Sequence, residues 1–104
     1  MVRIHGRWCG PNWTDGQSIT AAEHKARGGT VKEPCQDKLD CACRTHDQQC
    51  SGEKGCTFKA DTNLIEACDR ILINPLNLIL NPVMYGKAKL VKDFFSIARF
   101  AREN

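Results

Sequence analysis

Mostly apolar side chains recur at helical spacing in three stretches of the chain. In residues 37–50 one face carries Leu39, Cys43, His46 and Cys50, which follow one another at intervals of four, three and four. Residues 57–73 carry a second stripe made of Asp61, Leu64, Ile65, Cys68 and Leu72. Residues 82–102 carry a third, made of Val83, Leu90, Phe94, Ile97 and Phe100, with basic residues between them. The pattern predicts three amphipathic helices over these ranges.

The pattern predicts mainly loops and turns in the rest of the chain. Three glycines and a proline in residues 6–16 predict a loop, and residues 51–55 predict a turn between the first two helices. Residues 17–34 look irregular, with a short helix near 20–25. The apolar run 71–80 is interrupted by asparagines and a proline, and it reads as core or interface. No stretch alternates long enough to predict a strand, so we expect a mainly α fold.

The composition indicates a single domain, residues 1–104, with many cross-links. Seven cysteines in 104 residues are typical of an oxidising compartment and a disulfide framework. Because the count is odd, at least one cysteine is free or pairs with another chain, and we expect this to be Cys35.

The net charge and the first residues of the chain indicate the compartment in which we expect the protein. A net charge of +3 is too small to indicate nucleic acid but suits an anionic lipid surface. No apolar stretch reaches the ~20 residues of a membrane span. The first six residues do not resemble a signal peptide. We therefore expect a secreted protein, or one delivered by another route to an extracellular or membrane-facing compartment.

His46 and Asp47 are the first candidates for chemistry. Neighbouring helix residues point about 100° apart, so the two serve adjacent tasks rather than bonding each other. His46 lies on the cysteine-bearing face and is a candidate general base. The short turn at 51–55 predicts that the two helices pack antiparallel, which brings Asp61 opposite His46. Asp61 would then accept from one imidazole nitrogen and leave the other free to act on water.

The cysteine positions agree with this pairing. Cys50 comes four residues after His46, and Cys56 five before Asp61; Cys41 comes five before His46, and Cys68 seven after Asp61. Along antiparallel helices these offsets match to within about one turn. We therefore expect the bridges Cys50–Cys56 and Cys41–Cys68.

Three segments together resemble the secreted phospholipase A2 family. Residues 43–47, Cys-Arg-Thr-His-Asp, are similar to its active-site helix, and residues 8–12, Trp-Cys-Gly-Pro-Asn, to its calcium loop. The Gly-Pro pair in that loop most resembles the parvovirus-type domain. Ala60 and Asp61, with Leu64 and Cys68 following, are similar to the partner helix. The resemblance covers roughly residues 6–72.

The resemblance implies a mechanism, residue by residue. His46 is the base for water and Asp61 orients it. The carbonyls of Trp8, Gly10 and Asn12, with the Asp47 carboxylate, bind Ca²⁺. The Gly10 amide and the calcium stabilise the oxyanion formed at the sn-2 ester of a phospholipid at a membrane surface. A bridge Cys9–Cys43 is also implied.

The chain departs from the family at named positions. Cys50 stands where a supporting tyrosine is common, and Asn12 where glycine is usual. Asp69 is an alternative to Asp61 as the residue that orients His46. Pairing Asp69 with His46 would, however, leave Cys41 without a cysteine at a matching offset on the second helix. These departures keep open a catalytically silent relative that binds a membrane or a partner. A zinc module built on Cys41, Cys43, His46 and Cys50 is a third reading. We expect His5 and His24 to lie on the surface.

Overall fold

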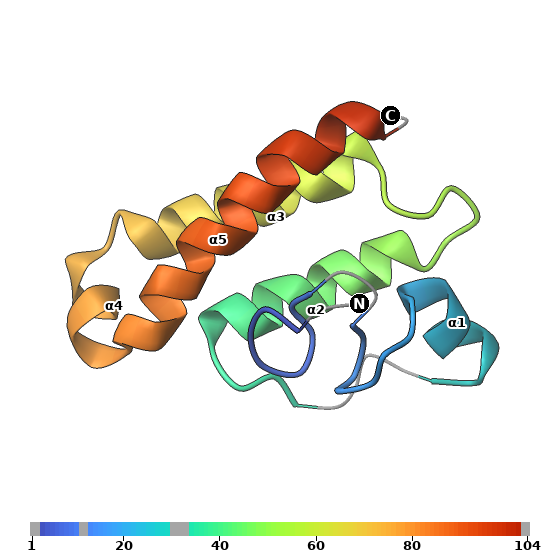
Figure 1. The fold of residues 1–104 in the computed structure, drawn as a ribbon, viewed down its shortest axis with the longest axis horizontal. Helices are drawn as coiled ribbons and strands as arrows, with labels where there is room; N and C mark the ends of the chain where they lie inside the picture. The colour runs from blue at the N-terminus through green and yellow to red at the C-terminus, as the bar shows by residue number, and fades with distance from the viewer. Residues whose placement is uncertain (1–2, 11–12, 30–33, 103–104) are drawn as a thin grey trace.

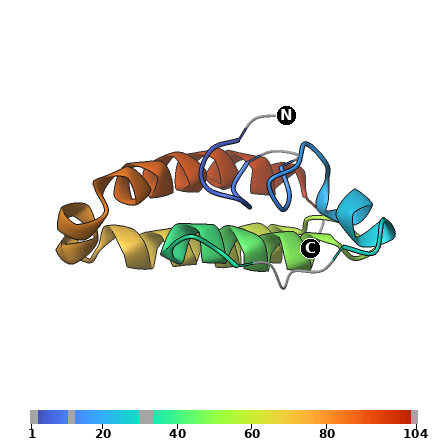
Figure 2. The same cartoon turned by 90° about the horizontal axis from the view of Figure 1, so that it is seen from below.

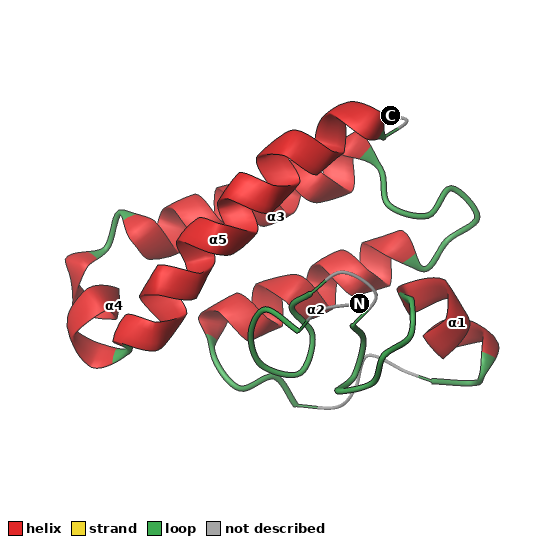
Figure 3. Cartoon of the chain, viewed as in Figure 1, coloured by secondary structure: helices red, strands yellow, loops and turns green. Residues whose placement is uncertain are grey.

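The structure, a computed structural model, describes residues 3–10, 13–29 and 34–102. The described residues are mainly helical and form no strand (Figures 1 and 3). The elements in chain order are α1 (Ala21–Ala26), α2 (Lys38–Cys50), α3 (Phe58–Leu72), α4 (Pro75–Leu80), α5 (Pro82–Ala98) and the 3-10 turn η1 (Arg99–Ala101). Among these residues, no helix is both long and apolar enough to traverse a bilayer.

Local sequence explains where each helix begins. A side chain just before the helix accepts a backbone N–H of the first turn in all five cases: Thr20, Asp37, Thr57, Asn74 and Asn81. Pro75 and Pro82 stand in first turns, where a missing N–H costs nothing. The observed α2 and α3 therefore start one residue inside the ranges expected for them, because the first residue of each range is the cap.

The helices form two layers. α2 and α3 run antiparallel side by side, and α5 lies over α3 while the N-terminal loops lie over α2 (Figures 1 and 2). The core between the layers combines residues from the loop, α2, α3 and α5: Trp8, Leu39, Cys43, Leu64, Ile65, Cys68, Ile71, Met84, Ala88, Val91 and Phe95. α3 is thus the central helix, packed on α2 at one side and α5 at the other.

The C-terminal half differs in two respects from the expectation. The predicted helix 82–102 ends at Ala98 and continues as η1. The run 71–80, expected as core or interface, contains the short helix α4, whose large apolar side chains Leu76, Leu78, Ile79 and Leu80 are all exposed. α4 therefore serves as the connection between α3 and α5 and adds little to the core.

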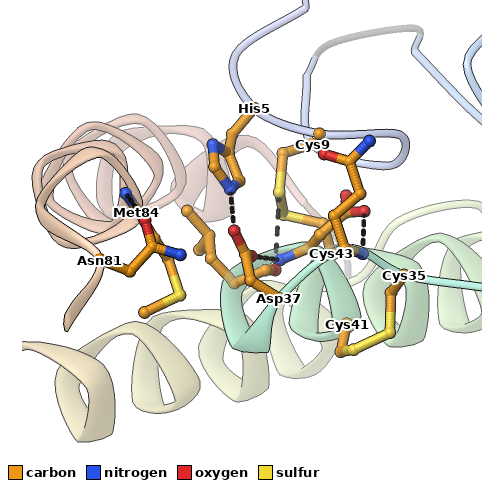
Figure 4. A network of polar contacts seen from close by, with 12 residues as sticks. His5, Cys9, Cys35, Asp37, Cys41, Cys43, Asn81 and Met84 are labelled. Carbon is orange, nitrogen blue, oxygen red and sulfur yellow. Dashed lines mark hydrogen bonds and ion pairs between the residues drawn. A yellow bond between two sulfur atoms is a disulfide. The ribbon is translucent and has the colours of Figure 1, made fainter. Parts of the chain in front are cut away.

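Three disulfides are present, two as expected. Cys50–Cys56 closes the turn between α2 and α3, and Cys9–Cys43 ties the N-terminal loop to α2. The expected Cys41–Cys68 bridge is wrong, because Cys41 pairs with Cys35 (Figure 4). Cys35 is accordingly not the odd cysteine, and it offers no free thiol to another chain. The free cysteine is Cys68, fully buried on α3.

The rotation of the helices explains this error. Cys41 lies five residues before His46, which turns it about 140° away from the face that His46 presents to α3. Cys68 follows Asp61 by seven residues and shares its inward face. The axial offsets placed Cys41 and Cys68 at about the same position along the two antiparallel helix axes. They took no account of the direction in which each side chain points away from its helix. Cys35, in the segment just before α2, reaches Cys41 with a Cα–Cα distance of 5.0 Å.

Thiol labelling tests this assignment. Burial, with a smaller contribution from the neighbouring Asp69 charge, raises the pKa of Cys68 to about 12, so its thiol is protonated and unreactive. We expect the native protein to take up no alkylating reagent and the denatured, unreduced protein to take up one equivalent at Cys68. Peptide mapping by mass spectrometry locates the label, and a label on Cys35 or Cys41 would contradict the assignment. Cys68→Ala serves as the control and should take up none.

Candidate active site

His46 and Asp61 meet between α2 and α3. The imidazole Nε2 of His46 lies 2.6 Å from Oδ1 of Asp61, and the side chains are 6% and 0% exposed. An ionised carboxylate only accepts hydrogen bonds, so Nε2 carries the ring proton and Nδ1 is the free nitrogen. Asp69, the competing aspartate, instead forms an ion pair with Lys92 and has a side chain that is 45% exposed. The residue opposite His46 is therefore Asp61.

Two further side chains hold this pair. The ring of Phe95 on α5 meets the imidazole edge to face, with centroids 4.7 Å apart. Arg102, which follows η1, donates from Nε to Oδ2 of Asp61 at 3.1 Å. Sequence reasoning missed both, since neither lies in a motif and both reach His46 and Asp61 only through the packing of α5 on α3. Cys50 lies beside the ring, with Sγ 3.6 Å from Nε2, but its sulfur belongs to a disulfide and donates nothing.

The N-terminal loop is anchored on the first turn of α2 by Asp40. Its fully buried carboxylate accepts the backbone N–H groups of Arg7 and Trp8 through Oδ1 and that of Gln36 through Oδ2. The turn needs glycine at Gly6, where φ is +60° and a Cβ atom would lie 2.5 Å from this carboxylate. These three hydrogen bonds to Asp40 fix the position of the N-terminal loop against the first turn of α2.

The loop then meets α2 again at the Cys9–Cys43 bridge. Cys43 stands one helical turn before His46 and Asp47, so the bridge brings Gly10 to their side of the helix. Gly10 has a φ of +150°, which favours glycine, and its carbonyl accepts from Trp13 N–H at 3.2 Å. Trp8 is 1% exposed and packs in the core, so it does not face a lipid surface.

Four of the predicted site residues border one cavity of about 350 Å³: Trp8, Gly10, His46 and Asp47. Arg102 and the apolar side chains of Trp13, Leu64, Phe94 and Phe95 complete much of its wall. Asn12, predicted as a calcium ligand, lies outside the described residues. A larger cavity of about 570 Å³ also touches His46, between α2 and α3, but no residue of the loop lines it. The smaller cavity is therefore the one that joins the loop to His46.

Among the residues that border this cavity, Asp47 has an unfavourable environment for its negative charge. Its Oδ2 atom is buried and has no hydrogen-bond partner among the described residues. Burial, with a smaller contribution from the negative charge of Asp40, raises the pKa of its carboxyl to about 8. A buried carboxylate oxygen without a donor fits a cation, and Ca²⁺ prefers carboxylate and carbonyl oxygens. Trp8 and Gly10 border the same cavity as Asp47, and backbone carbonyls are oxygen donors of the type that calcium takes.

The cysteines expected to bind zinc are all joined in disulfides. His46, Cys50 and Cys56 form a group whose ligand atoms lie within 4.8 Å of one another. Zinc binds cysteine as the thiolate, whereas Cys50 and Cys56 are joined in a disulfide. Cys41 and Cys43, the other predicted ligands, also form disulfides. The group of three becomes a ligand set only after reduction.

The other two histidines are not surface residues, contrary to expectation. Nε2 of His5 lies 2.6 Å from Oδ2 of Asp37, at the start of α2 (Figure 4). His24 is buried and its Nε2 lies 3.3 Å from Oδ2 of Asp15. Each ties part of the N-terminal region to an aspartate, with the His24 ring buried and the His5 side chain 11% exposed. Neither histidine borders the cavity of about 350 Å³.

Comparison with known proteins gives no relative. No protein-family model matches the chain, and neither the curated proteins nor the solved structures contain a match.

The pKa of Asp47 predicts how stability depends on pH without calcium. Its folded value of about 8 lies above the ordinary value of 3.8. Between these values the folded protein holds a proton that the unfolded chain releases, so this group lowers the free energy of unfolding as pH rises. We expect urea unfolding to show this decline between about pH 4 and pH 8, and Asp47→Asn to make it shallower. The exposed Asp93→Asn variant is the control, and equal slopes in all three proteins would contradict the prediction.

Proposed function

We propose that this protein is a calcium-dependent phospholipase A2 that hydrolyses the sn-2 ester of glycerophospholipids at a membrane surface. One observation carries the proposal: His46, which pairs with the buried Asp61, borders the same cavity as Gly10 and as Asp47, whose buried Oδ2 atom has no partner among the described residues. The similarity of residues 8–12, 43–47 and 60–68 to that enzyme family supports the same reading.

His46 is the general base in this mechanism. Because Asp61 accepts the Nε2 proton, Nδ1 is free to take a proton from a water molecule as that water attacks the ester carbonyl. Asp61 then stabilises the imidazolium that forms, as the carboxylate of a triad does. The imidazolium later returns the proton to the departing alcohol of the lysophospholipid. Phe95 keeps the ring in its plane and limits the access of bulk water.

The carbonyls of Trp8 and Gly10 and the carboxylate of Asp47 would hold calcium, together with Asn12. When bound, calcium supplies Lewis-acid polarisation of the ester carbonyl. The backbone N–H of Gly10 is the proposed donor to the oxyanion. Asp47 gains most from the cation, because its buried Oδ2 atom otherwise has no donor among the described residues.

The walls of the cavity suit an acyl ester. Tryptophan, leucine and phenylalanine side chains line much of it, and a volume of about 350 Å³ is within the range of small-molecule sites. Phe94 belongs both to this wall and to the outer surface, where it is 40% exposed. A lipid leaving a bilayer would therefore meet an apolar path into the cavity.

The exposed face of α5 is the proposed contact with the membrane. Val83, Leu90, Phe94 and Ile97 recur at intervals of seven, four and three, so they share one side of the helix, and they are 40–77% exposed. No acidic residue occurs between Asp69 and Asp93, whereas Lys87 and Lys89 flank the stripe. An apolar helical face with lysines beside it favours an anionic bilayer. This partner fits a secreted or membrane-facing enzyme.

Fatty-acid release tests the activity. We expect vesicles labelled at the sn-2 chain to release label with calcium and not with chelator. His46→Gln and Asp61→Asn should each lower the rate at least about a hundredfold, since each disables proton transfer. Asp69→Asn is the matched control and should keep the rate, because Asp69 lies on the surface with Lys92.

Two results would overturn this proposal. One is release that survives His46→Gln or the chelator. The other is normal vesicle binding by the wild type without any turnover, which would identify a silent lipid-binding module.

Substitution on α5 tests the membrane contact. Ile97→Asp removes an exposed apolar side chain and adds a negative charge, so we expect about tenfold weaker co-sedimentation with anionic vesicles, equal to ~1.4 kcal/mol. The rate on a dissolved short-chain substrate should stay unchanged. Ser96→Asp adds the same charge one position earlier, off the stripe, and should bind nearly as the wild type does. Equal losses in both variants would mean that charge alone, rather than the apolar face, determines binding.

A further inference from the structure

Asp61 is a buried carboxylate with two separate partners. It is fully buried, its Oδ1 faces His46 at 2.6 Å, and its Oδ2 accepts from Nε of Arg102 at 3.1 Å. Arg102 lies 41 residues further along the chain, and its side chain is 31% exposed. The guanidinium therefore keeps contact with water while neutralising a carboxylate that has none.

This contact has a physical consequence for His46. A buried carboxylate without a second donor is costly and is free to turn about its χ2 torsion. A charge-assisted hydrogen bond to Oδ2 offsets that cost and fixes the carboxylate plane, which directs Oδ1 at the imidazole. Cys50, one turn after His46, is a disulfide sulfur and cannot supply such a donor, and in the described part of the chain the donor shown at Oδ2 is Arg102.

The end of the chain is docked so that Arg102 reaches Asp61. Arg99 lies over the ring of Phe58 at 5.0 Å and donates to Oγ1 of Thr62 at 3.3 Å. Phe100 meets Phe58 edge to face, with centroids 6.1 Å apart. Phe58 and Thr62 flank Asp61 on the first turns of α3, so these contacts hold η1 beside it.

We propose that Arg102 is a positioning residue, which holds Asp61 so that His46 keeps its proton on Nε2 and leaves Nδ1 free. The catalytic part of this inference rests on the proposed function, whereas the structural part does not. Arg102 also borders the cavity, so direct contact with a substrate phosphate is the competing role. The two roles differ in kinetics, because positioning lowers kcat and substrate contact raises KM.

The first test needs no activity. Nitrogen-15 NMR of the His46 ring, recorded without calcium or lipid at a pH where the ring is neutral, reports which nitrogen carries the proton. We expect the wild type and Lys89→Gln to show a proton on Nε2 alone. Arg102→Gln should show a mixture of the two tautomers, and Arg102→Lys should restore most of the Nε2 form. Lys89 is exposed and pairs with Asp93 rather than with Asp61, so in the absence of lipid its variant controls for the lost charge.

A second measurement covers the case in which Arg102→Gln does not fold. In the wild type the Nε–H of Arg102 should exchange slowly with water, and its resonance should shift in His46→Gln, because the two groups share Asp61. Rapid exchange of that proton, or no shift, would overturn the proposal. So would a folded Arg102→Gln with the ring spectrum of Lys89→Gln.

Kinetics then separate positioning from substrate contact. We expect Arg102→Gln to lower kcat about tenfold to a hundredfold, as loss of an outer partner does, with KM nearly unchanged. A raised KM with kcat unchanged would overturn positioning in favour of phosphate binding. If the wild type hydrolyses nothing while the ring spectra change as expected, the proposed function fails and the role of Arg102 in holding Asp61 and His46 stands.

Discussion

The buried carboxylate of Asp40 is the constraint on which the arrangement of the site depends. From the first turn of α2 it accepts two backbone N–H groups of the N-terminal loop, those of Arg7 and Trp8, and one from Gln36, just before the helix. Ordinary loops satisfy their amides with water, so a charged acceptor in the core gives this loop one strongly favoured position. The Cys9–Cys43 bridge then only has to fix the second point of attachment. Asp40 and this bridge together therefore fix the part of the loop that carries Gly10.

The same helix carries a second aspartate, Asp47, whose Oδ2 atom is also buried. Asp40 has its hydrogen bonds satisfied, whereas Oδ2 of Asp47 has no partner among the described residues, and the charge of Asp40 makes ionisation of Asp47 still less favourable. A protein that only needed a stable α2 would gain from an apolar residue at position 47. The buried, unpartnered Oδ2 atom of Asp47 is therefore the electrostatic feature that supports the proposed calcium site. Asp61, by contrast, has a donor at each oxygen.

The prediction from the residues succeeded where distance along the helix axis decided the outcome. Matching offsets from His46 and Asp61 indicated the facing pair and the Cys50–Cys56 bridge, because a short turn leaves two helices only one antiparallel register. The Cys41–Cys68 bridge failed because closure also needs both sulfurs to point at the same place. Position around a helix follows from the sequence at about 100° per residue, so that error was avoidable.

The sequence by itself predicted the three long helices and the His46–Asp61 pair at the centre of the site, since helical periodicity and the register across a short turn depend on residues close together in the chain. Only the tertiary structure decided which groups surround that centre. Asp40 looked like an ordinary first-turn aspartate, and Arg102 like one more basic residue of an amphipathic tail. Their roles arise from contacts across 33 and 41 positions. Such contacts depend on how α5 packs over α3 and how the loop packs over α2, which no local pattern records.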